Sequence, residues 1–119
     1  MQSCLAGIVY VKVDGRQLSV RGTATVSPQP TTRTGVVGAD GIHGFTCEWR
    51  VPYVEIEISV MPEFPLSDLY QINDATITVE LGNGQVYVLR NAWHADEIEH
   101  DTVEGTATVR FEGRSCVLQ

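Results

Sequence analysis

The stretch ATITVELGNGQVYVLRNAW, Ala75 to Trp93, decides the expected fold of this chain. Its first half alternates strictly between apolar and polar residues, which is the period of a strand with one buried face. The apolar side carries Ile77, Val79 and Leu81, and the polar side carries Thr76, Thr78 and Glu80. Asn83-Gly84 is a strong hairpin signal. The second arm, QVYVLR, is apolar on both faces and indicates a strand that is covered on both sides.

Working outward, most of the chain reads as strand. Asp14-Gly15 predicts a type I′ turn between a strand over 7–13 and another over 16–26. FTCEWR, YVEIEISVM and TATVRFEG continue the strand pattern, and Pro52 interrupts the first two of these. LSDLYQIND predicts one short helix with Ser67 as its N-cap. We therefore expect seven or eight strands in a single domain over 1–119, an antiparallel β-sandwich or barrel with one short α-helix.

One long segment, 27–44, breaks this pattern. It contains Pro28, Pro30 and four glycines, and no period runs through it. Long irregular loops inside a compact domain are usually functional, so we expect it to project from the sheet.

The composition disfavours several classes of function. The 119 residues carry 15 acidic and 8 basic side chains, a formal net charge of −7, which disfavours a protein that grips nucleic acid. Cys4, Cys47 and Cys116 have no metal-binding spacing, and we expect reduced thiols. The N-terminus lacks a basic region and predicts a strand rather than an export signal. No segment is long and apolar enough to span a bilayer, so we expect a soluble intracellular protein.

Several short motifs could carry chemistry, and each has a simpler interpretation. HADEIEH would place His94, Asp96 and His100 on one face of a strand, as in a metal site, but a solvated hairpin tip explains the same residues more simply. GADGIHG lacks the lysine of a phosphate loop, and its Asp40 and His43 have no nucleophile nearby. Glu55 and Glu57 lie side by side on one strand rather than across a cleft. Trp49 and Trp93 are typical of a core or an interface. We assign no catalytic residue, metal or cofactor.

Two segments together carry a family resemblance. VGADGIHGFTCEWRVPYVEIEI, from Val37 to Ile58, and the stretch from Asp74 to Gly113 resemble the tail tube proteins of Mu-like phages and prophages, which are similar to the tubes of type VI secretion. The order and spacing of the VGADG-HG loop, the PY-E-EI strand and the YVLR-AW hairpin carry the resemblance. The C-terminal RSCVLQ lacks the acidic tail expected from that family.

The resemblance implies a structural virion protein rather than an enzyme. Its copies would form hexameric rings with a lumen-lining β-barrel, stacked into a tube in the host cytoplasm. Implied partners are other copies of the chain, the tape-measure protein, tail terminator and baseplate or tail-tip proteins, and a sheath if the tail contracts. DNA would pass through without specific binding, and no membrane is involved.

Two sets of residues are predicted to serve this assembly. The inter-ring stacking loop comprises Val36, Val37, Asp40, Ile42 and His43. The lumen face, expected to be net acidic, comprises Arg21, Thr23, Thr25, Glu48, Thr76, Thr78 and Glu80. The alternatives are a β-sandwich module that binds a ligand or protein through its loops, and a metal-dependent hydrolase built on HADEIEH.

Overall fold

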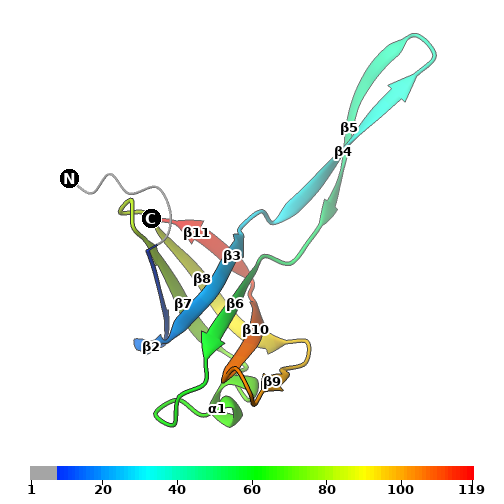
Figure 1. Ribbon diagram of the computed structural model, residues 1–119. Helices are drawn as coiled ribbons and strands as arrows, with labels where there is room; N and C mark the ends of the chain where they lie inside the picture. Colours follow the sequence, from blue (N-terminus) through cyan, green and yellow to red (C-terminus); the bar gives the residue numbers. More distant parts are fainter. Residues whose placement is uncertain (1–7) are drawn as a thin grey trace.

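The structure is a computed structural model that describes residues 8–119, so the expectations for the first seven residues, Cys4 included, lie outside the described residues (Figure 1). Within this range it has eleven strands and one helix. The elements are β1 Val9–Val13, β2 Arg16–Leu18, β3 Val20–Ser27, β4 Thr31–Gly38, β5 Gly41–Trp49, β6 Tyr53–Ser59, α1 Leu66–Tyr70, β7 Ala75–Leu81, β8 Val86–Ala95, β9 His100–Asp101, β10 Thr106–Glu112 and β11 Ser115–Leu118.

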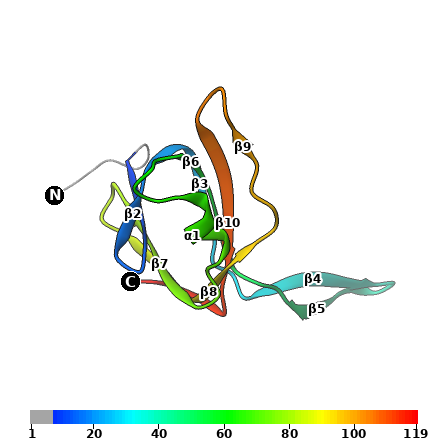
Figure 2. The ribbon, with the colours of Figure 1, turned by 90° about the horizontal axis from the view of Figure 1, so that it is seen from below.

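Nine of these strands form one antiparallel sheet. Its order is β2-β1-β7-β8-β10-β6-β3, with β11 beside β8 and β9 beside β10. The ten-residue β8 pairs first with β7 and then, at Trp93 to Ala95, with β10. The sheet folds over at β8, so that the β1–β7–β8 half and the β3–β6–β10 half face each other (Figure 2). The mainly antiparallel β fold is confirmed, and the barrel is not closed because β2 and β3 do not pair.

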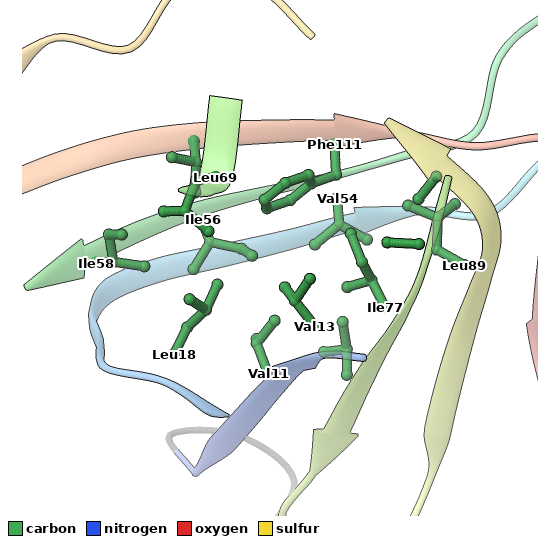
Figure 3. Packing of buried hydrophobic residues seen from close by; sticks show 14 of the residues in the cluster. Val11, Val13, Leu18, Val54, Ile56, Ile58, Leu69, Ile77, Leu89 and Phe111 are labelled. Atoms are coloured by element: carbon green, nitrogen blue, oxygen red, sulfur yellow. The ribbon is translucent and has the colours of Figure 1, made fainter. Parts of the chain in front are cut away.

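The core fills the space between these two halves (Figure 3). Alternate residues of β6 and β10 point inward, among them Val54, Ile56 and Phe111, which are fully buried. They meet Val11 and Ile77 from the other half. Because side chains alternate along a strand, the polar residues between them necessarily lie on the outer faces of the sheet.

The hairpin that opened the analysis forms as predicted. Ile77 and Val79 are buried, and Val88 and Leu89 are both buried on the second strand, so β8 is covered on both faces there. Residues 82–85 connect the two strands, and in this turn Gly84 has a φ of 92° and its N–H donates to the Leu81 carbonyl over 3.1 Å. Asp14-Gly15 forms the predicted type I′ turn, with φ values of 49° and 87°.

The predicted helix is shorter than expected. It ends at Tyr70, and its N-cap is Pro65 rather than Ser67, which lies inside the first turn. Pro65 is extended, with φ −66° and ψ 149°, and no side-chain hydrogen bond caps the helix. Leu69 anchors the helix in the core. No helix within residues 8–119 combines the length and apolar character that crossing a bilayer requires.

The prediction of an irregular loop over 27–44 is wrong. Residues 31–49, called the arm from here on, form a hairpin in which eight residue pairs join β4 to β5. The strand expected from FTCEWR is therefore part of β5, the second strand of this hairpin, and β5 already starts at Gly41. The arm projects from the body (Figures 1 and 2) and extends the long dimension of the molecule to 61 Å. Its glycines and exposed faces hid the strand pattern, because neither face is buried in its own core.

Candidate assembly surfaces

The arm has one apolar face. Residues that pair across an antiparallel ladder share a face, and the side alternates along each strand. The pairs Thr31–Trp49, Arg33–Cys47, Gly35–Phe45 and Val37–Ile42 therefore lie on one side. The opposite side carries Thr32, Thr34, Val36, Gly44, Thr46 and Glu48. We call the first side the arm's apolar face.

This face has no partner within the described chain. Val37 is 76% exposed, Ile42 84%, Phe45 56% and Trp49 87%. Arg33 lies over the ring of Phe45, with its guanidinium carbon 4.8 Å from the ring centroid. A row of large apolar side chains at such exposure is typical of a surface that contacts another protein.

The tip of the arm is held by a histidine. A bulge between Val36 and Val37 leaves His43 without a cross-strand partner. Its ring lies against Gly38, where a Cβ atom would sit only 2.2 Å from the imidazole. Its Nε2 is 2.6 Å from Oδ1 of Asp40, and this contact lowers the pKa of the Asp40 carboxyl. The predicted Asp40 and His43 are thus bonded to each other, and their arrangement fixes the shape of a turn.

The root of the arm is braced against the body. The guanidinium of Arg50 donates to Oγ of Ser27 over 2.7 Å and to the Gln29 carbonyl over 2.6 Å. The Arg50 N–H also donates to the Pro30 carbonyl over 3.0 Å. These bonds connect the segment that enters the arm to the segment that leaves it. They therefore define the direction of the arm relative to the body.

The outer face of the β3–β6–β10 half is polar. Its outward residues are Thr25, Glu55, Glu57, Thr108, Arg110 and Glu112, and the exposed Arg21 and Thr23 lie beside them in the bulged stretch of β3. Arg110 lies in the middle of this face, with its guanidinium carbon 3.8 Å from the centroid of the Tyr53 ring. Its guanidinium nitrogens lie 3.4 Å from a carboxylate oxygen of Glu55 and 3.2 Å from one of Glu112. Burial lowers the pKa of Arg110, but the hydrogen bond to Glu112 and the charges of Glu112 and Asp96 outweigh this effect and raise the pKa. The face therefore presents hydrated, internally paired charges.

The outer face of the β1–β7–β8 half differs in character. It carries Thr76, Thr78 and Glu80, and the last is 3.3 Å from Nζ of Lys12. Beside them lie exposed apolar side chains, Ile8, Tyr10 and Val117. This face is more apolar than the one across the core.

The structure separates the seven residues predicted to line a lumen. Arg21, Thr23 and Thr25 lie on the β3–β6–β10 face, Thr76, Thr78 and Glu80 lie on the β1–β7–β8 face, and Glu48 lies on the arm. The stacking set also divides, because Val37 and Ile42 share the apolar face while Val36 is on the opposite side. Sequence reasoning missed Phe45, and it assigned Trp49 to a core or an interface without grouping it with Val37 and Ile42. The pairing of β4 with β5 puts all four on one face.

The other motifs do not converge on a reactive site. His94 is in β8, Asp96 has a φ of 62° just beyond it, and His100 is in β9, so the three do not share a strand face. No group of three or more His, Cys, Asp or Glu within residues 8–119 is placed to hold a metal ion. Glu55 bonds Arg110, as described above.

Comparison with known proteins identifies the family of this chain. The family described as phage tail tube protein matches residues 2–117. The chain belongs to this family. The tail tube protein of Escherichia phage Mu is 27% identical over 95 residues, which cover 80% of each chain. The Mu-like prophage FluMu tail tube protein of Haemophilus influenzae is 27% identical over 114 residues, 96% of this chain and 88% of that one.

Solved tube structures share the fold of this tail tube protein. The sheath/tube terminator of an extracellular contractile injection system, PVC, has a TM-score of 0.67 at 11% identity, covering 93% of this chain and 92% of that one. Hcp1 from Flavobacterium johnsoniae has a TM-score of 0.53 at 11% identity, covering 94% of each chain. At this identity the likeness shows the fold. The family gives the protein a structural role in the phage tail tube, as predicted.

Proposed function

We propose that copies of this tail tube protein form hexameric rings that stack through the arm into a tube. The arm's apolar face carries this proposal, because it exposes Val37, Ile42, Phe45 and Trp49 without a partner in the described chain. Burying one such side chain fully is worth about 1.5–3 kcal/mol. A ring presents every arm at once, so contacts that are weak for one copy become strong for the assembled ring.

We assign the wall of the lumen to the outer face of the β3–β6–β10 half. A water-filled channel favours the polar outer face of the sheet, whereas the more apolar β1–β7–β8 face suits contact with protein. In this proposal Thr23 and Thr25 line the wall, with Arg21 at its edge. If β8, β10, β6 and β3 from six copies continue one barrel, its 24 strands at a ~4.8 Å spacing and ~40° tilt give a backbone diameter of roughly 48 Å.

Such a tube would enclose the tape-measure protein and then conduct DNA. The wall offers paired charges and hydroxyls rather than clustered lysine and arginine, so DNA would release few counterions on it and slide rather than bind. Other partners would be a tail terminator, baseplate or tail-tip proteins and, in a contractile tail, a sheath. Two structural relatives are a sheath/tube terminator and a tube-terminating cap, which supports the first of these. Assembly would take place in the host cytoplasm.

Electron microscopy of the purified protein tests the proposal, with rings and stacked tubes as the expected result. A variant with Val37→Ser, Ile42→Ser and Phe45→Ser should keep its β circular dichroism and fail to form tubes. The matched control changes the other face of the arm through Thr32→Ser, Thr34→Ser and Thr46→Ser, and it should assemble normally. Tubes formed equally well by the first variant would refute the role of the arm.

A further inference from the structure

A hollow of about 340 Å³ lies at one end of the body, where β6 ends and β3 begins. Leu18 and Ile58 form its floor and are buried, and Met61 and Phe64 form its wall. Met61 remains 42% exposed although it lies beside this apolar floor. Neither the core nor the lumen face described above accounts for this hollow.

The hollow and the arm are at opposite ends of the molecule. β3 runs from Val20 beside the hollow to Ser27 at the root of the arm, and β6 runs back from Tyr53 to Ser59. Figure 1 shows the arm leaving one end of these strands while the segment before α1 closes the other. A projection at one end and a recess at the other is the geometry of a head-to-tail contact, which repeats without closing.

The chemistry of the hollow matches the tip of the arm. The tip presents Val37 and Ile42, which suit an apolar floor, beside Asp40 and His43. Glu63 lines the hollow, and Arg16 lies beside it. The Arg16 guanidinium is 3.9 Å from the Phe64 ring centroid, donates to the Glu63 carbonyl over 3.0 Å and lies 3.7 Å from Oδ2 of Asp68. A tip seated in the hollow would bring Asp40 of one copy against Arg16 of the other. It would also bring His43 of the first copy against Glu63 of the second.

We propose that this hollow receives the arm tip of a second copy of the chain. The inference rests on the proposed function, and it adds the receiving surface. Val37 and Ile42 would cover Leu18, Ile58 and Met61, while Asp40 faces Arg16. The arm leans away from the body (Figures 1 and 2), so the receiving copy is offset sideways from the donor in the next ring. Each arm thereby links a position in one ring to a neighbouring position in the next.

Cross-linking in mixed assemblies tests this contact. One population carries Ile42→Cys and the other carries Met61→Cys, and the two are mixed before assembly and oxidised. A disulfide between positions 42 and 61, identified by peptide mass spectrometry, is expected in assembled tubes. The control mixture pairs Ile42→Cys with Val103→Cys. Val103 is 91% exposed in the turn before β10, whose first residue pairs with Ser59 beside the hollow, and it should give no such link.

A charge placed in the hollow gives an independent result. Met61→Asp should leave a folded subunit that forms no tubes, and Val103→Asp should assemble like the wild type. If wild-type tubes form, yet Met61→Asp also assembles and the 42–61 disulfide is missing, the receiving site is wrong while the tube function stands. If the wild-type protein forms no tubes under any assembly condition, both proposals are overturned.

Discussion

His94 and Phe111 are cross-strand partners on β8 and β10, and the imidazole meets the phenyl ring edge-on, with ring centroids 5.9 Å apart at 82°. Nε2 of His94 is shielded from solvent and has no hydrogen-bond partner among the described residues. Burial in this apolar setting lowers the pKa of His94 below its ordinary value of 6.5, although the nearby Asp96 carboxylate acts in the opposite direction. The fold therefore favours a neutral imidazole.

This preference predicts a loss of stability on mild acidification. Because the folded pKa lies below the unfolded one, the contribution of neutral His94 is complete above pH 6.5 and declines as the pH falls toward the folded pKa. Urea unfolding between about pH 7.5 and about pH 5 should show a falling free energy of unfolding in the wild type and a flatter profile in His94→Leu. The exposed His100→Gln is the control and should follow the wild type. Parallel profiles for His94→Leu and the wild type would contradict the expectation.

Replacing glycine by alanine should change the stability of the subunit at one position and leave it unchanged at another. A Cβ at Gly113 would lie 2.8 Å from two carbon atoms of Leu89 and 2.9 Å from the Arg90 carbonyl oxygen, whereas a Cβ at Gly35 on the arm would meet nothing within 4 Å. Gly113→Ala should therefore destabilise the subunit by about 1–3 kcal/mol in urea unfolding. Gly35→Ala should stay within about 0.5 kcal/mol of the wild type. An unchanged unfolding midpoint for Gly113→Ala would mean that β8 and the chain after β10 can separate without cost.

Lysines on the proposed lumen wall should slow DNA. Thr23→Lys with Thr25→Lys changes two exposed residues of β3 and should not prevent assembly. Each added ammonium near the path gives DNA a phosphate contact, so its release from tailed particles should become slower at low salt and recover at high salt. Thr23→Gln with Thr25→Gln is the size-matched control without charge. Release of DNA from the lysine particles at the control rate at low salt would place Thr23 and Thr25 outside the lumen.

Cysteine reactivity should report the assembly state. Cys47 is an exposed free thiol on the arm's apolar face, whereas Cys116 is half-buried and its burial raises the pKa of the thiol. A short maleimide pulse should label Cys47 in free subunits and leave it unlabelled in tubes, while Cys116 reacts slowly in both because little thiolate is present. After denaturation without reductant, Cys4, Cys47 and Cys116 should all be alkylated. Equal labelling of Cys47 in tubes and subunits would exclude burial of this face.

Most strands and turns could be predicted from the sequence because they depend on residues that are close together in the chain. Alternation over Ala75–Leu81 and Thr106–Glu112 specified strands and their buried sides, and Asp14-Gly15 specified a turn through the positive φ values it requires. The strands of the arm could not be predicted in the same way. A strand pair that buries no face in its own core shows little alternation of apolar and polar residues. Its glycines at 35, 38, 41 and 44 further weakened the pattern.

By itself, the sequence determined the mainly antiparallel β class, the inward and outward residues of most strands and, through collinear motifs, the tail tube family. Tertiary structure alone decided which outward residues lie together. Alternation states that Thr23 and Thr78 both point away from the core, but they lie on opposite outer faces because the sheet folds over at β8. Likewise, only the register of β4 with β5 puts Val37, Ile42 and Phe45 on one face, since a shift of one residue would send each to the other side. Pairing across a sheet depends on contacts distant in the sequence, and these determine the surfaces from which a tube can be built.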